Sequence, residues 1–123
     1  MLVVDDYPDA ARLVCDLLGW LGHACRPATT GRAALETAAD HQPDVIILDI
    51  GLPDISGWDL APMLRAVLAP KPVRIGAMTG WGTPADRARS EAAGIDAHLV
   101  KPPTLAKLSL ILGDEFASRR ATR

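Results

Sequence analysis

The sequence predicts an α/β domain in which a doubly wound parallel sheet carries helices on both faces. Two observations support this expectation. Short apolar runs alternate strictly with segments of helical apolar spacing along the 123-residue chain, and the apolar runs end abruptly at polar residues. Such runs are typical of strands buried on both faces, and their alternation with helices is typical of parallel α/β sheets. Ligands of these sheets bind outside the carboxyl ends of the strands.

Five segments are expected to form strands. Four of them are clearly apolar: Met1–Val4, Val45–Leu48, Val73–Met78 and Ala97–Val100. The fifth, His23–Arg26, is short and has a weaker pattern. The segments between the strands carry apolar residues three and four positions apart and are expected to form crossover helices. These helical segments are Asp9–Leu21, Gly31–His41, Trp58–Leu68, Arg87–Ala93 and Thr104–Ala117.

The prolines agree with this plan at most positions. Pro8 and Pro84 fall in the first turns of expected helices, where the missing N–H group costs little. Pro62 lies one turn inside the third helix, where it removes a backbone hydrogen bond and crowds the carbonyl of Trp58. We therefore expect the third helix to begin late or to bend.

Length and composition fit one globular domain spanning residues 1–123. The chain is 49% hydrophobic and 23% charged, and its net charge of -2 offers no footprint for nucleic acid. We therefore expect no nucleic-acid partner on this chain. The apolar runs are far shorter than the roughly 18 residues of a membrane span, and no signal peptide opens the sequence. These observations predict no membrane contact and a cytoplasmic location.

The chain has two cysteines, Cys15 and Cys25. They could pair with each other by number alone. However, Cys15 falls within a helical apolar pattern, and nothing marks the chain as secreted. We therefore expect both cysteines to be buried, reduced thiols.

Acidic side chains follow two of the expected strands. Asp5 and Asp6 come directly after the first apolar run, and Asp49 comes directly after Val45–Leu48. Parallel strands end at the same edge of a sheet, so these carboxylates are expected to converge there. Their mutual repulsion is costly unless a cation compensates, and Mg²⁺ prefers such oxygen ligands. The sequence therefore predicts a magnesium site at this edge.

A simpler interpretation remains open for part of this cluster. Asp5 and Asp6 could cap the first helix, because aspartate is favoured at that position. Asp49 is harder to explain in this way, since Gly51 and Gly57 make the following segment a loop in which its side chain need not act as a cap.

Two further polar residues follow the later strands. Lys101 follows Ala97–Val100 and precedes Pro102, so its ammonium can point back into the pocket and pair with a carboxylate or a phosphate oxygen. Thr79 follows Val73–Met78, the fourth expected strand. Alternatively, Lys101 is an ordinary surface lysine and Thr79 bonds only to nearby backbone. The bond between Lys101 and Pro102 is a candidate for the cis form.

Four segments of the chain, taken together, resemble the receiver domain of two-component response regulators. They occur in the expected order and at the ends of successive strands: Leu2–Asp6, Leu48–Pro53 with Gly57, Met78–Gly80 and Val100–Pro102. The resemblance covers essentially the whole chain. It implies a flavodoxin-like (βα)5 fold with a five-stranded parallel sheet in the order 2-1-3-4-5. The loops look most like those of receivers fused to hybrid sensor histidine kinases.

The resemblance also implies roles for individual residues. Asp49 matches the phosphoacceptor, which takes a phosphoryl group from a phosphohistidine of a histidine kinase or a histidine phosphotransfer domain. The Mg²⁺ ligands would be Asp6 directly, Asp5 largely through water, Asp49 and the carbonyl of Gly51. Thr79 and Lys101 match the groups that contact the phosphoryl oxygens. Such a domain is a signalling switch that assists its own phosphorylation and dephosphorylation, and some dimerise when phosphorylated.

One position departs from the family pattern. After phosphorylation Thr79 moves inward, and an aromatic residue on the fifth strand often repacks beside it. Here that position is occupied by His98, which is smaller and has a charge that depends on pH near neutrality. His98 could instead be a partly exposed histidine of an edge strand. Trp81, two residues after Thr79, is expected to slow the entry of water and prolong phosphorylation.

Other functions remain as alternatives. Gly80–Ala85 nominally matches a dinucleotide-binding pattern, but it follows the fourth strand and leaves the acidic residues unexplained. A metal-dependent phosphatase could use Asp49 as nucleophile, but such enzymes need a second acid where Gly51 stands. A receiver-like module that binds partners without phosphorylation is disfavoured, because the full residue set is present.

Overall fold

The computed structural model describes residues 1–80 and 82–112. Five parallel strands form one sheet in the order β2-β1-β3-β4-β5, as predicted. The strands are β1 (Leu2–Val4), β2 (Arg26–Ala28), β3 (Val45–Asp49), β4 (Arg74–Thr79) and β5 (Ala97–Val100). The helices are α1 (Pro8–Trp20), α2 (Gly31–His41), α3 (Gly57–Leu68) and α4 (Pro84–Ala92), and residues 105–112 are also helical. The rest of the last expected helix lies outside the described residues.

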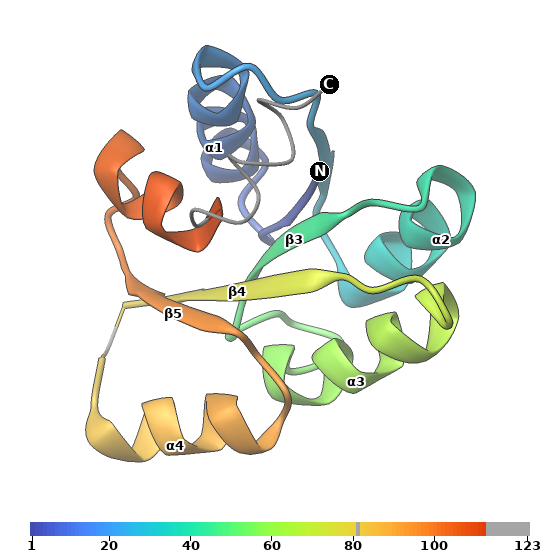
Figure 1. Ribbon diagram of the computed structural model, residues 1–123. Coiled ribbons are helices and arrows are strands. Elements are labelled where there is room, and N and C mark those ends of the chain that lie inside the picture. Colours follow the sequence, from blue (N-terminus) through green and yellow to red (C-terminus); the bar gives the residue numbers. More distant parts are fainter. Residues whose placement is uncertain (81, 113–123) are drawn as a thin grey trace.

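Helices cover both faces of the sheet (Figure 1). Successive residues of β3 serve opposite faces: Ile46 and Leu48 pack with α2 and α3, whereas Val45 and Ile47 pack with α1 and the 105–112 helix. This alternation follows from the two-residue period of a strand. The sheet therefore separates two apolar clusters, and both are fully buried at β3. Within the described ranges, no helix has the length and apolar character that crossing a membrane requires.

The second strand begins three residues later than expected. Residues 21–25 connect it to α1, and the N–H of Arg26 donates to the carbonyl of Met1 at 2.9 Å. Pairing with β1 sets this boundary, because Leu2 lies opposite Arg26. Pro27 fits within β2 because this strand is at the edge of the sheet, where one side of the backbone needs no partner.

The third helix does not begin late, although Pro62 lies inside it. It starts at Gly57, and the hydroxyl of Ser56 accepts a hydrogen bond from the N–H of Asp59 at 3.2 Å. Leu60 and Leu64 on its inner face are fully buried. A good cap and a buried face thus support a helix through the proline, and the expected late start is wrong.

The expectation of reduced thiols is also wrong. Cys15 on α1 and Cys25 before β2 form a disulfide, with their Cα atoms 5.3 Å apart. This separation lies within the usual range for bridged cysteines. Both residues are half-buried. The apolar spacing correctly placed Cys15 on a helix but could not show that this helix packs beside the segment that leads into β2.

Candidate functional site

Three carboxylates lie together at the carboxyl edge of the sheet. Asp5 follows β1 and Asp49 ends β3, and these strands are neighbours in which Val4 pairs with Leu48. One oxygen from each of Asp5, Asp6 and Asp49 lies within 4.8 Å of the others. The predicted convergence of the three residues is therefore confirmed. We call them the acidic cluster.

Lys101 brings a positive charge to the acidic cluster. Its Nζ lies 3.0 Å from Asp49 Oδ2 and 3.4 Å from Asp5 Oδ2. The backbone holds it there, because the N–H of Lys101 donates to the carbonyl of Thr79 at 2.7 Å. The bond between Lys101 and Pro102 is cis, as predicted. Lys101 is thus a half-buried partner of the carboxylates and not an ordinary surface lysine.

The charges of the site alter one another's pKa values. Burial raises the pKa of Asp5, whose exposure is only 1%, and the charge of Asp49 adds to that effect. Hydrogen bonds from the Tyr7 N–H and the Lys101 ammonium act in the opposite direction without cancelling it. Burial acts to lower the pKa of Lys101, but its bonds to Asp49 and Asp5 outweigh burial and raise this pKa. Lys101 therefore stays charged near neutral pH.

The helix-capping interpretation of Asp5 and Asp6 does not hold. The cap position of α1 is Tyr7, and no side chain accepts a hydrogen bond there. Asp5 Oδ1 accepts from the N–H of Tyr7 at 3.0 Å, which closes a local turn outside the helix. Pro8 begins α1 and has no N–H to satisfy. Asp5 and Asp6 therefore do not cap α1, and helix capping no longer stands as an alternative to metal binding.

The loop after β3 holds Asp49 in a fixed orientation. The N–H of Gly51 donates to Asp49 Oδ1 at 3.0 Å, while Oδ2 faces Lys101. Gly57 closes the loop, because its N–H donates to the carbonyl of Ile50 at 2.9 Å. A side chain at Gly57 would not fit, since its Cβ would lie 2.7 Å from the Cα of Ile50. Both oxygens of Asp49 are thus oriented before any ligand arrives.

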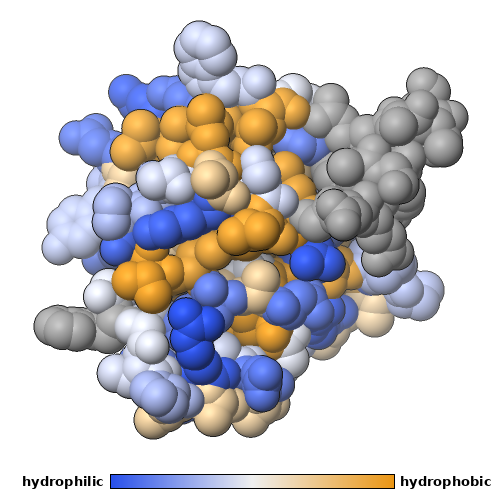
Figure 2. Space-filling model, turned by 60° about the vertical axis from the view of Figure 1, so that its left-hand side comes forward, coloured by the Kyte–Doolittle hydropathy of each residue, from blue (hydrophilic) through white to orange (hydrophobic). Residues whose placement is uncertain are grey.

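The surface of the molecule mixes hydrophilic and hydrophobic side chains. Figure 2 brings forward the left-hand side of Figure 1 and shows hydrophilic side chains between hydrophobic patches. Several large apolar residues of the described chain are exposed on α1, on the turn before it and on the 105–112 helix: Tyr7, Leu13, Trp20, Leu105 and Leu110. Tyr7 directly follows the acidic pair and is 68% exposed.

Residues 1–112 match the family model of the response regulator receiver domain. The chain belongs to this family. Among curated proteins, it is 39% identical to the transcriptional regulatory protein KdpE of Mycobacterium tuberculosis over 83% of the chain and 44% of KdpE. It is 35% identical to the sensor histidine kinase RcsC of Escherichia coli over 85% of the chain and 11% of RcsC. The chain thus spans less than half the length of these relatives.

Solved receiver structures have the same fold. The chemotaxis protein CheY4 of Vibrio cholerae aligns with a TM-score of 0.81 and 28% identity, over 90% of this chain and 92% of CheY4. A response regulator of Burkholderia pseudomallei aligns with a TM-score of 0.83 and 27% identity, over 98% of this chain and 70% of that protein. That structure contains a phosphorylated aspartic acid, a calcium ion and citrate. The flavodoxin-like receiver fold predicted from the sequence is confirmed.

The two predicted switch residues of this receiver lie on neighbouring strands. Thr79 ends β4 and His98 lies on β5, two positions before Val100, which is the partner of Thr79 in the ladder. His98 is half-buried, yet both of its ring nitrogens are buried and neither has a hydrogen-bond partner among the described residues. Burial, followed by the charge of Arg87, lowers the pKa of His98, and Asp86 opposes them. Trp81 lies outside the described residues.

Sequence reasoning missed the structural role of Asp54. Its position between Pro53 and Gly57 marked it only as part of a loop, whereas its carboxylate accepts hydrogen bonds from the first turn of α2. No local pattern reveals this contact, because the donors lie 22 and 23 positions earlier in the chain. The sequence shows that Asp54 is acidic, but it does not show that Asp54 contacts α2.

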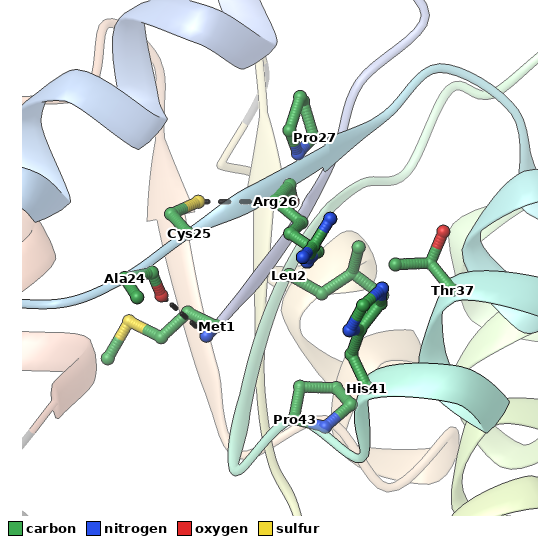
Figure 3. A pocket seen from close by; sticks show the side chains of 9 residues that line it. All are labelled: Met1, Leu2, Ala24, Cys25, Arg26, Pro27, Thr37, His41 and Pro43. Carbon is green, nitrogen blue, oxygen red and sulfur yellow. Dashed lines mark hydrogen bonds between the residues drawn. The ribbon is translucent and has the colours of Figure 1, made fainter.

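A separate hollow of about 480 Å³ lies at the amino end of β1 and β2 (Figure 3). Arg26 and His41 extend toward each other in it, and the N-terminal ammonium of Met1 donates to the carbonyl of Ala24. Its lining contains none of the predicted site residues and no carboxylate. This hollow is therefore distinct from the acidic cluster at the opposite edge of the sheet.

Proposed function

We propose that this receiver accepts a phosphoryl group on Asp49 from a phosphohistidine of a histidine kinase or a histidine phosphotransfer domain. The supporting observation is the Lys101 ammonium 3.0 Å from Asp49 within a cluster of three carboxylates. A carboxylate alone would repel the anionic donor, whereas a fixed ammonium offsets that charge. We further propose that residues 1–123 form a single domain whose partners are proteins and not nucleic acid or membrane.

The transfer is an in-line displacement. An oxygen of Asp49 forms a bond to phosphorus while the bond between phosphorus and the donor imidazole breaks, and that nitrogen keeps the electron pair. The product is an acyl phosphate. The N–H of Gly51 orients the nucleophile, and the ammonium of Lys101 lies where negative charge gathers on the phosphoryl oxygens. The protein contributes mainly position and charge.

The donor set also fits a hard divalent cation. Three carboxylates share one ammonium in the described site, so a net negative charge remains. Asp6 and Asp49, with Asp5 and the carbonyl of Gly51, would hold Mg²⁺, which prefers oxygen ligands. When bound, the ion supplies electrostatic stabilisation of the phosphoryl charge. Burial, and after it the charge of Asp49, raises the pKa of Asp5, so a bound cation would stabilise its ionised form.

The signal would leave the site through Thr79 and His98. The hydroxyl of Thr79 can donate to a phosphoryl oxygen, and its inward movement would change the space available beside β5. His98 is then the side chain that repacks. Its ring nitrogens are buried and have no hydrogen-bond partner among the residues that the structure describes, so hydrogen-bonding capacity is unused there. A changed surface around β5 could then favour a partner or a second copy of the phosphorylated domain.

Intact-mass spectrometry after incubation with acetyl phosphate and Mg²⁺ tests the proposal. We expect one phosphoryl adduct on the wild type, none on Asp49→Asn, and one on the control variant Asp59→Asn. Asp59 is a suitable control because it lies exposed in the first turn of α3. An adduct that persists in Asp49→Asn, or no adduct on the wild type, would contradict the proposal.

Hydrolysis of p-nitrophenyl phosphate separates the switch from the phosphatase alternative. A phosphatase needs an acid to protonate the leaving group, and the position two residues after Asp49 is Gly51. We therefore expect no measurable turnover of this substrate. Sustained turnover that is lost in Asp49→Asn would favour the phosphatase.

A further inference from the structure

Asp54 connects the phosphorylation loop to a neighbouring helix. It lies in the loop of residues 50–56, which joins β3 to α3 and contains Gly51. Its Oδ1 accepts a hydrogen bond from the N–H of Gly31 at 2.9 Å, and its Oδ2 accepts one from the N–H of Arg32 at 3.0 Å. Both carboxylate oxygens are therefore used by the first turn of α2.

The α2 helix does not depend on Asp54 alone for its N-terminus. Thr30 is the cap residue, and its hydroxyl accepts from the N–H of Ala33 at 3.0 Å. The first turn of α2 has no acidic residue of its own, so Asp54 provides the negative charge that a helix N-terminus favours. These two backbone hydrogen bonds lower the pKa of Asp54. Two separate groups thus cap one helix, and only Asp54 belongs to the loop.

The rest of the loop is held at its ends. Ile50 and Leu52 are buried with 8% exposure each, and the N–H of Ile50 donates to the carbonyl of Met78 at 3.2 Å. At the far end, Gly57 bonds to the carbonyl of Ile50. Ile55 packs close to Gly31, where a Cβ would lie 3.0 Å from the Cβ of Ile55. Gly51 itself is exposed, so the contacts on either side of it determine where its carbonyl lies.

We propose that Asp54 is a positioning residue: by joining the middle of the loop to α2, it keeps Gly51, whose N–H donates to Asp49 Oδ1, beside the acidic cluster and so favours binding of a divalent cation. This inference rests on the proposed function, because it concerns the same metal site. Asp54 is not itself a ligand, because its carboxylate is directed at the first turn of α2 and is not one of the three that form the acidic cluster. Its effect passes through the loop backbone.

Thr30 provides a matched control. Thr30→Ala removes one of the two caps of α2 and leaves the hydrogen bonds between the loop and α2 intact. Asp54→Ala removes the other cap and, with it, the hydrogen bonds that join the loop to α2. If Asp54 served only the stability of α2, the two variants would act alike. If it positions the loop, only Asp54→Ala should weaken cation binding. Asp54→Asn keeps one acceptor oxygen and should fall between wild type and Asp54→Ala.

Isothermal titration calorimetry with MgCl₂ measures the effect without any phosphoryl donor. We expect Asp54→Ala to raise the Kd for Mg²⁺ by about three- to tenfold, and Thr30→Ala to change it by less than about twofold. With acetyl phosphate, Asp54→Ala should react slowly at low Mg²⁺ and approach the wild-type rate at saturating Mg²⁺. Circular dichroism checks that each variant is folded, and Asp54→Asn gives the decisive comparison if Asp54→Ala is not.

Three outcomes would overturn the proposal. A folded Asp54→Ala and a folded Asp54→Asn with the wild-type Kd would show that Asp54 does not position the loop. An equal rise in Kd in Thr30→Ala would assign the effect to helix stability. If the wild type binds no Mg²⁺, both this inference and the metal site of the proposed function are wrong. If the wild type binds Mg²⁺ and the variants have the same Kd, only this inference is wrong.

Discussion

Lys101 Nζ lies 3.0 Å from Asp49 Oδ2, although the two residues are 52 positions apart in the chain. The ends of β3, β4 and β5 create this pair, since Lys101 bonds through its backbone to Thr79. The same ammonium also reaches Asp5. The Lys101 ammonium therefore pairs with carboxylates that follow two different strands. Its loss should slow phosphorylation and leave the carboxylates of the acidic cluster without a positive partner.

Lys101→Met is expected to slow phosphorylation of Asp49 by acetyl phosphate by about 10²-fold, because the charge that faces the phosphoryl oxygens is removed. The time course of adduct formation by mass spectrometry measures this rate. Lys71→Met is the control, because Lys71 pairs with Asp44 at the surface and should keep the wild-type rate. Equal rates in wild type and Lys101→Met would show that the ammonium does not assist transfer.

Asp5→Asn is expected to stabilise the metal-free protein by an amount on the order of 1 kcal/mol, because it removes a buried charge that Asp49 repels. The same change should reduce the stabilisation that Mg²⁺ gives to the wild type. Urea unfolding with and without MgCl₂ measures both effects. Asp16→Asn, at an exposed position of α1, should behave like the wild type. A less stable metal-free Asp5→Asn would contradict the expected repulsion.

Acid is expected to destabilise the fold through His98. Its pKa is lowered from 6.5, first by burial and then by the charge of Arg87, while Asp86 opposes both. Between the lowered pKa and 6.5 the unfolded chain binds more protons, so stability present above pH 6.5 is lost as the pH falls through this range.

Urea unfolding at about pH 7.5 and about pH 5.5 tests this effect, since the pH range spans the ordinary pKa of histidine. We expect His98→Phe to lose less stability than the wild type between the two conditions. His41→Gln, at an exposed position near the end of α2, should lose as much as the wild type. The same loss in His98→Phe and wild type would refute a titrating role for His98.

Reduction of the disulfide is expected to lower the free energy of unfolding. The bridge joins residues 10 positions apart, for which loop-closure entropy predicts about 2–3 kcal/mol. Urea unfolding with and without dithiothreitol measures the difference. A Cys15→Ser variant should match the reduced wild type and show no response to the reductant. An oxidised wild type that unfolds at the same urea concentration as the reduced one would contradict the prediction.

Much of the site could be predicted because it depends on simple geometry. Once Val4 and Leu48 are assigned to parallel strands, Asp5 and Asp49 must meet at one edge, and Lys101 follows by the same rule. The cis bond after Lys101 was expected from Pro102 alone. The chemistry of these residues and the direction of the strands were sufficient to predict that they lie together.

The remaining features depend on contacts that no local pattern encodes. The boundary of β2 is set by its pairing with β1, in which Arg26 lies opposite Leu2, and the link between Cys15 and Cys25 depends on how α1 packs. The bonds of Asp54 to α2 require a donor more than twenty positions away. The ring nitrogens of His98, which have no partner in residues 1–80 and 82–112, are buried by neighbouring elements. Each of these features is a property of packing.

The separation of the core into two clusters has a consequence for protein engineering. Ile75 belongs to the cluster that includes α2 and α3, whereas Leu108 belongs to the cluster that includes α1. Side chains that share no partner usually contribute additively to stability. The two sides of this receiver can therefore be redesigned as separate modules, with improvements found on one side combined freely with those found on the other.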